Sequence, residues 1–150
     1  MSTIENPFLN LHMLVVDDEK FMRSLLVRLL QEFQVGRISE AIDGQNALEM
    51  IKNTKTYVDV ILLDLEMPNL NGFEFIQEMK KQVPSPQSDI PVVVISGLGD
   101  EDAVAAVQAL GIKLFLLKPV SRHALASRLN SAIRMPEYRQ AIKGRLPALK

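Results

Sequence analysis

Short apolar runs alternate with longer amphipathic segments along the chain. Four runs rich in Val, Ile and Leu cover residues 13–16, 60–63, 92–95 and 114–117. Continuous apolar runs of this kind are typical of parallel strands buried on both faces, whereas a strand with one wet face alternates polar and apolar residues. A weaker strand pattern at 36–41 lies between the first two runs, so the sequence predicts five strands.

Segments with the apolar spacing of a helix separate the predicted strands. They cover residues 21–33, 45–52, 72–83, 101–110 and 121–134. Asp43 is placed to open the second segment, Gly111 to close the fourth and Ser121 to open the fifth. Residues 83–89, VPSPQSD, are rich in Pro and Ser, and we expect a loop there. Five alternations of strand and helix predict an α/β domain with helices on both faces of a parallel sheet.

Composition narrows the class of protein. The chain has 150 residues, 47% apolar and 23% charged, which excludes a disordered tail or a coiled coil and suggests one domain. Cysteine is absent, which excludes disulfides, Cys zinc sites and thiol chemistry. No apolar run is long enough to span a bilayer and no signal-peptide pattern opens the chain, so we expect a cytoplasmic protein without a membrane partner.

The formal net charge of −1 combines two unlike regions. Residues 1–120 carry 10 Lys or Arg and 17 Asp or Glu, a net of −7, whereas residues 121–150 carry 7 and 1, a net of +6. A segment of one sign indicates either a partner surface or a solvated face. We expect 135–150 to be a basic tail, the start of a linker to an output domain, or a docking helix at 137–143. Without a recognition helix or aromatic platform, direct nucleic-acid binding is not expected.

Polar side chains follow the predicted strands at the edge where parallel sheets bind ligands. Asp17 and Asp18 follow the first strand, Asp64 the third, Ser96 the fourth and Lys118 the fifth. Three carboxylates held close repel one another unless a cation neutralises them, and without Cys or a nearby His a hard ion such as Mg²⁺ fits best. The set points to phosphoryl chemistry, with Asp64 as nucleophile and the hydroxyl and ammonium groups stabilising the phosphoryl oxygens.

Each of these residues also has an ordinary structural interpretation. Asp17 and Asp18 could cap the following helix, Ser96 could be a turn residue, and Lys118 could be a surface lysine before a proline. Asp64 could belong to a loop rich in turn formers. Their joint occurrence at four strand ends, in an order that forms one site, favours the chemical interpretation.

The chain resembles the receiver domains of two-component response regulators in four stretches: MLVVDDE at 13–19, VILLDLEMPNLNG at 60–72, VVVISG at 92–97 and FLLKP at 115–119. The resemblance covers residues 11–134. It implies the flavodoxin-like fold, a doubly wound five-stranded parallel sheet with helices on both faces. It also implies a signalling phosphoacceptor, not an enzyme, that takes a phosphoryl group from a sensor histidine kinase or a histidine phosphotransfer protein.

The resemblance further implies a phosphoacceptor and a magnesium site. Asp64 is the implied phosphoacceptor. Asp18 and Asp64 bind Mg²⁺ directly, Asp17 does so mainly through water, and Glu66 contributes its backbone carbonyl. The acidic Glu66 side chain departs from the commonest pattern, and we expect it to alter the lifetime of the acyl phosphate.

A switch and a partner surface are implied as well. Ser96 and Lys118 hold the phosphoryl oxygens, and Phe115 turns inward when Ser96 moves. Residues 101–110 present a largely alanine outward face, for which the high helix propensity of alanine is the alternative explanation. We expect this face, with the last strand and helix, to bind an output protein, a linked output domain or a second copy in a homodimer.

Two other classes of function remain open. A phosphatase of the haloacid dehalogenase type also combines an aspartate nucleophile with Ser or Thr, Lys and Mg²⁺. In that superfamily, however, the acidic pair follows the nucleophile, and Glu66 stands where its DxD signature has the second aspartate. A pseudo-receiver that binds partners without phosphorylation is the other alternative, and the complete set of site residues argues against it.

Overall fold

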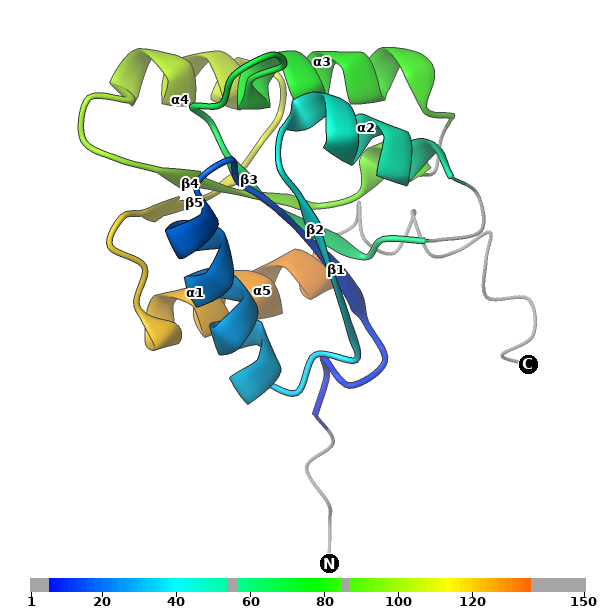
Figure 1. Ribbon diagram of the computed structural model, residues 1–150, viewed down its shortest axis with the longest axis vertical. Coiled ribbons are helices and arrows are strands. Elements are labelled where there is room, and N and C mark those ends of the chain that lie inside the picture. The colour runs from blue at the N-terminus through cyan, green and yellow to red at the C-terminus, as the bar shows by residue number, and fades with distance from the viewer. Residues whose placement is uncertain (1–5, 54–56, 85–86, 136–150) are drawn as a thin grey trace, which may run out of the picture.

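Five parallel strands form a single sheet in the computed structural model, which describes residues 6–53, 57–84 and 87–135 (Figure 1). The strands are β1 (His12–Val16), β2 (Arg37–Ala41), β3 (Val60–Asp64), β4 (Val92–Ser96) and β5 (Leu114–Leu117). Their order in the sheet is β2-β1-β3-β4-β5, and every neighbouring pair is parallel. This order is that of the flavodoxin-like doubly wound fold, which confirms the predicted fold class.

Five α-helices cover the two faces of this sheet (Figure 1). One face carries α1 (Lys20–Glu32) and α5 (Arg122–Arg134). The other carries α2 (Gly44–Lys52), α3 (Gly72–Gln82) and α4 (Glu101–Ala109). The proposed tail or docking helix beyond residue 135 lies outside the described residues.

Two apolar clusters fill the space between the sheet and its helices. Successive side chains of a strand point to opposite faces, so in β4 Val94 packs in the cluster under α2, α3 and α4, while Val93 and Ile95 pack in the cluster under α1 and α5. Every residue of β1, β3 and β4 is buried. Burial on both faces explains why these strands read as continuous apolar runs.

The predicted caps hold their helices as expected. Asp43 accepts a hydrogen bond from the Asn46 backbone N–H at 2.8 Å at the start of α2, and Ser121 accepts one from Ala124 N–H at 3.1 Å at the start of α5. Gly111 follows the end of α4 with a φ of +96°, a left-handed conformation that glycine adopts without steric cost.

The segment before β4 differs from its prediction. Residues Gln87–Asp89 form a short 3₁₀ helix, where the sequence predicted a loop throughout 83–89. The Ser88 N–H donates to the Pro84 carbonyl at 3.3 Å. Pro and Ser exclude a long α-helix but permit a single tight turn, and 3₁₀ turns serve as connectors of this kind.

The chain is packed from before the first strand. Phe8 is buried, and its ring lies 6.2 Å from that of Phe33, which follows α1. Asn6 donates to the Phe33 carbonyl at 2.7 Å, and the Gly36 N–H donates to the Phe8 carbonyl at 3.1 Å. Residues 6–10 therefore close the apolar cluster at the end of the sheet opposite to the carboxyl ends of the strands (Figure 1).

Candidate functional site

Three carboxylates meet at the carboxyl ends of β1 and β3. Each of Asp17, Asp18 and Asp64 offers one oxygen, and these oxygens all lie within 4.8 Å of one another. The register of β1 and β3 aligns Val16 with Leu63, which brings the residues that follow them together. Asp17 and Asp64 are buried, and Asp18 is exposed. The structure therefore assembles the predicted acidic cluster from two separate stretches of the chain.

Asp17 is fully buried, and only one of its carboxylate oxygens is satisfied. Oδ1 accepts a hydrogen bond from the Glu19 backbone N–H at 2.8 Å, whereas Oδ2 has no hydrogen-bond partner among the described residues. Burial raises the pKa of Asp17 above its ordinary value. A buried carboxylate oxygen without a partner is costly, and a hard cation removes that cost, so the cluster fits a divalent ion such as Mg²⁺.

The alternative that the acidic pair caps α1 finds no support here. The N-cap residue of α1 is Glu19, and its side chain makes no capping hydrogen bond. Asp17 bonds the N–H of that N-cap residue itself, not an N–H of the first helical turn. The pair thus precedes the helix, and the exposed Asp18 still places one oxygen within 4.8 Å of those of Asp17 and Asp64.

Lys118 brings an ammonium group into contact with a carboxylate of this cluster. Its Nζ lies 3.3 Å from Asp64 Oδ1, and its backbone N–H donates to the Ser96 carbonyl at 2.8 Å. Burial raises the pKa of Asp64 to about 6, the Asp17 charge acts in the same direction, and the Lys118 charge opposes both. Burial alone lowers the pKa of Lys118, but the charges of Asp64 and Asp17 outweigh it and raise that pKa overall.

The other predicted site residues lie at or near the same edge. Ser96 ends β4, is buried, and pairs in register with Leu117, the residue before Lys118. Phe115 is half-buried and packs against the cluster under α2, α3 and α4. Glu66 is exposed, and its backbone N–H is bonded to the Asp64 carboxylate.

The sequence did not predict two hydrogen bonds that join the loop after Asp64 to the start of α2. Asn69 donates through Nδ2 to Asp43 Oδ2 at 3.0 Å, and the Gly44 N–H donates to the Leu70 carbonyl at 3.1 Å. Asn69 has a φ of +66°, a conformation that Asn tolerates better than most residues. The turn-forming residues of this loop indicate a turn in the sequence, but they do not show that the loop pairs with Asp43 and Gly44.

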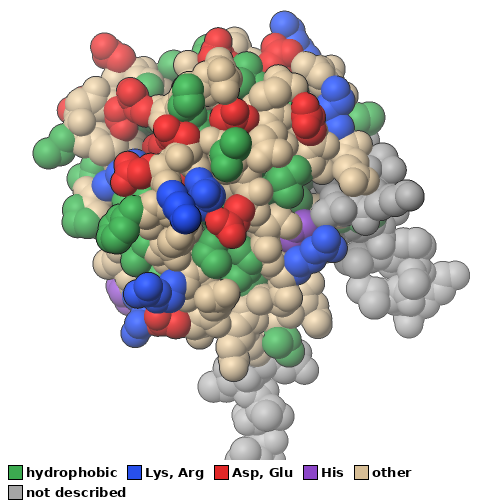
Figure 2. Space-filling view, viewed as in Figure 1, with side chains coloured by type: hydrophobic (Ala, Val, Ile, Leu, Met, Phe, Trp, Pro, Cys, Tyr) green, Lys and Arg blue, Asp and Glu red, His purple; other side chains and the backbone are tan. Residues whose placement is uncertain are grey.

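The molecular surface reflects the acidic character of this region. Acidic side chains are concentrated in the upper half of the face shown in Figure 2, over the region where Figure 1 shows α2, α3 and the carboxyl ends of the strands.

No helix in the described part of the chain is long and apolar enough to cross a membrane.

Comparison with known proteins identifies one family. The response regulator receiver domain family matches residues 13–130. A structure of a response regulator receiver domain protein from Clostridium thermocellum is 28% identical with a TM-score of 0.72, over 83% of this chain and 94% of that one. The Vibrio cholerae chemotaxis protein CheY4 is 27% identical with a TM-score of 0.71, over 82% of this chain and 98% of that one.

Curated relatives are longer than the matched region. The probable transcriptional regulator ycf27 of Cyanidium caldarium is 34% identical over 131 residues, or 87% of this chain and 49% of that protein. A protein-glutamate methylesterase/protein-glutamine glutaminase of Pyrococcus horikoshii is 39% identical over 113 residues, which cover 72% of this chain and 28% of that protein. The response regulator RpfG of Xanthomonas campestris pv. campestris, a cyclic di-GMP phosphodiesterase, is 28% identical over 150 residues, which cover 97% of this chain and 38% of that protein. The chain thus spans half or less of the length of these relatives.

Proposed function

The chain belongs to the response regulator receiver domain family of two-component signalling, and on this premise we propose that it accepts a phosphoryl group on Asp64. The donor is the phosphohistidine of a sensor histidine kinase or a histidine phosphotransfer protein. The observation that carries the proposal is the buried Asp64 carboxylate, held 3.3 Å from Lys118 beside the acidic pair. An aspartate carboxylate attacks phosphorus and becomes an acyl phosphate.

The transfer step exchanges one bond to phosphorus for another. A carboxylate oxygen of Asp64 forms a bond to phosphorus while the bond from phosphorus to the histidine nitrogen breaks, and the nitrogen keeps the electron pair. Lys118 stabilises the charge on the phosphoryl oxygens, and Ser96 donates a hydrogen bond to one of them. The pKa of Asp64, raised by burial to about 6, leaves the carboxylate mostly ionised at neutral pH, as nucleophilic attack requires.

The same residues fit a bound Mg²⁺. Asp18 and Asp64 would hold the ion directly, Asp17 mainly through water, and Glu66 through its backbone carbonyl. When bound, Mg²⁺ offsets the negative charge on the transferring phosphoryl group. The partnerless Oδ2 of the fully buried Asp17 supports a cation at this place.

Phosphorylation would switch a partner surface through Ser96 and Phe115. Both lie on the side of the sheet that carries α4, Ser96 by the alternation of β4 and Phe115 by its packing. The added phosphate carries about −1.5 to −2 charge and favours the conformation that brings Ser96 and Lys118 closest to it. Ala105 and Ala109 are exposed on α4, which supports a partner or homodimer contact there. Unchanged partner binding after Ala105→Glu and Ala109→Glu would contradict this surface.

Residues 11–134 would be the cytoplasmic receiver, and 135–150 a tail or a linker to an output domain. The activities in the names of the curated relatives are theirs, and those proteins extend well beyond the matched region. We assign the receiver itself only its own aspartyl phosphorylation and dephosphorylation.

Intact-mass spectrometry tests the phosphoacceptor. Incubation with acetyl phosphate should add one phosphoryl group to the wild-type chain only when Mg²⁺ is present. Asp64→Asn should abolish the addition, and Asp102→Asn, the same change at an exposed position of α4, should leave it intact. Sustained turnover of a small phosphoester such as p-nitrophenyl phosphate would instead support the phosphatase. An unmodified wild-type chain with Mg²⁺ present would support the pseudo-receiver.

A further inference from the structure

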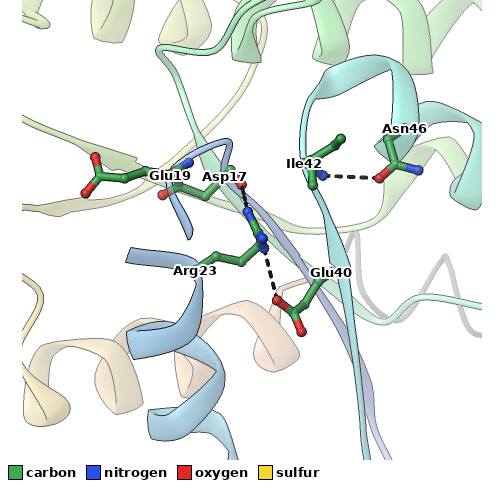
Figure 3. Close-up of polar contacts among 6 residues, drawn as sticks. All are labelled: Asp17, Glu19, Arg23, Glu40, Ile42 and Asn46. Atoms are coloured by element: carbon green, nitrogen blue, oxygen red, sulfur yellow. Dashed lines mark hydrogen bonds and ion pairs between the residues drawn. The ribbon is translucent and has the colours of Figure 1, made fainter. Parts of the chain in front are cut away.

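Arg23 of α1 connects the loop that bears the acidic pair to the edge strand of the sheet (Figure 3). Its Nη1 donates to the Asp17 backbone carbonyl at 2.8 Å, and its Nε donates to Glu40 Oε1 of β2 at 3.0 Å. The side chain of Arg23 is 13% exposed, although it carries a charge. One guanidinium group thus joins three elements, namely β2, α1 and the loop after β1.

The carbonyl that Arg23 holds belongs to the peptide unit between Asp17 and Asp18. The Asp17 N–H is fixed to the Ala41 carbonyl at 3.1 Å, and its Oδ1 is fixed by the Glu19 N–H at 2.8 Å. The Arg23 bond adds the third restraint, on the carbonyl side. Rotation of this peptide would move the Asp18 side chain, which is exposed.

We propose that Arg23 is a positioning residue for the divalent-cation site, which orients the Asp17–Asp18 peptide unit through its carbonyl. This inference rests on the proposed function, since the cation is the one that phosphorylation requires. A cation next to a cation site is otherwise unfavourable, because like charges repel. The contact with Glu40 offsets the positive charge of Arg23. What Arg23 then contributes to the cation site is its directional hydrogen bond to the Asp17 carbonyl.

A purely structural ion pair would look different. Arg122 and Glu32 form such a pair between α5 and α1, and both side chains are substantially exposed. Arg23 is much less exposed than Arg122 and uses one of its donors on the peptide of a proposed metal ligand. The planar fork of a guanidinium serves two acceptors in fixed directions, which the single ammonium of a lysine does not reproduce.

Titration calorimetry with MgCl₂ on the full chain tests the proposal. We expect Arg23→Ala to weaken Mg²⁺ binding about tenfold, the lower end of what loss of an outer hydrogen-bond partner costs a metal site. Arg23→Lys keeps the charge and should also bind Mg²⁺ more weakly than wild type. Arg28→Ala removes a charge from an exposed position of the same helix and should leave the affinity unchanged.

The direction of the change separates the explanations. If Arg23 acted only through its charge, Arg23→Ala would tighten Mg²⁺ binding and Arg23→Lys would leave it unchanged. If Arg23 only stabilised the fold, urea unfolding would change while the Mg²⁺ affinity of the folded variants stayed the same. Either result overturns the proposal, and Arg23→Lys decides the matter if the alanine variant does not fold.

Phosphorylation kinetics give a second readout. The rate with acetyl phosphate should approach the wild-type value in Arg23→Lys at saturating Mg²⁺, while the Mg²⁺ concentration for half-maximal rate rises. A reduced rate at saturating Mg²⁺ with an unchanged half-maximal concentration would contradict a positioning role. If the wild-type chain neither binds Mg²⁺ nor becomes phosphorylated, the proposed function fails. If it does both and the Arg23 variants match it, only this inference fails.

Discussion

Lys118 Nζ lies 3.3 Å from Asp64 Oδ1, and this ion pair connects two strands that are not neighbours in the sheet. Asp64 ends β3, Lys118 follows β5, and β4 lies between them. The lysine therefore reaches across the end of β4, past Ser96, to the carboxylate. Asp64 thus contacts the ammonium group of Lys118 and also belongs to the acidic cluster with Asp17 and Asp18.

Removal of this ammonium group should slow phosphorylation strongly. We expect Lys118→Ala to reduce the rate with acetyl phosphate about 10²-fold, the usual cost of losing one donor to a developing oxyanion. The pKa of Asp64 should rise further, because the positive charge that opposes burial is lost. Time-resolved intact-mass spectrometry measures the rate. Lys80→Ala, an exposed lysine of α3, is the control, and a wild-type rate in Lys118→Ala would refute the role of this residue.

The raised pKa of Asp64 predicts how stability depends on pH. The native state binds this proton more tightly than the unfolded chain, because the pKa is about 6 instead of 3.8. The associated stabilisation is complete below pH about 4 and is lost as pH rises through about 6, and a shift of this size corresponds to at most about 3 kcal/mol. Asp64→Asn, which does not ionise, should therefore stabilise the metal-free protein at pH 7.5.

Urea unfolding with EDTA at pH 7.5 and pH 4.5 measures this effect. The advantage of Asp64→Asn over wild type should shrink at the lower pH, where the wild-type carboxyl group is protonated. Added Mg²⁺ should reduce the advantage at pH 7.5, because the ion stabilises only the wild-type site. Asp102→Asn makes the same change at an exposed position of α4 and serves as the matched control. An equal effect of Asp64→Asn at both pH values would count against the assigned burial.

Gly72, the first residue of α3, lies very close to the end of β3. A Cβ atom at this position would lie 2.7 Å from the Asp64 carbonyl oxygen and 2.9 Å from Leu65 Cα. Gly72→Ala should destabilise the protein by about 1–3 kcal/mol, as overpacking does, and should slow phosphorylation by displacing Asp64. A Cβ atom at Gly97 would lie 3.8 Å from Asp100 Oδ2, which is an ordinary contact distance, so Gly97→Ala should be tolerated. Urea unfolding of both variants checks the contrast, which equal stabilities would refute.

Glu66 should influence anionic small-molecule donors through its charge. Its side chain is exposed, two residues beyond Asp64, and repels acetyl phosphate. Glu66→Gln should therefore raise the phosphorylation rate about twofold to threefold at low ionic strength, and the gain should fall as salt screens the charge. Glu49→Gln makes the same change at an exposed position of α2 and should have no effect. A gain that is independent of salt would exclude this electrostatic mechanism.

The sequence predicts the strands well because their burial on both faces leaves a local signature. The run at 13–16 became β1, His12–Val16, and the weak pattern at 36–41 became β2, Arg37–Ala41. The ends of two strands differ slightly, since Asp64 and Ser96 belong to β3 and β4 instead of following them. Backbone pairing continues one residue beyond the last apolar side chain, and composition alone does not show this.

Features that depend on packing between elements were not predictable. Arg23 and Arg28 are both polar positions of the amphipathic α1, and only the arrangement of that helix against β2 distinguishes them. Phe8 lies in a stretch with no regular spacing, and its burial depends on the position of Phe33 at the end of α1. In both cases the partner is distant in the sequence. Arg23 and Glu40 are 17 residues apart, and the neighbouring contact of Asn6 with Phe33 spans 27 residues.

The sheet separates two apolar clusters, with Phe75 of α3 in one and Leu129 of α5 in the other. Because the two side chains pack in different clusters, we expect substitutions at Phe75 and Leu129 to have additive effects on stability. Substitutions in the helices of one layer should therefore leave the packing of the opposite layer intact. The acidic cluster lies at the ends of β1 and β3, which are covered by both layers, so a substitution that loosens either layer should also disturb the cluster.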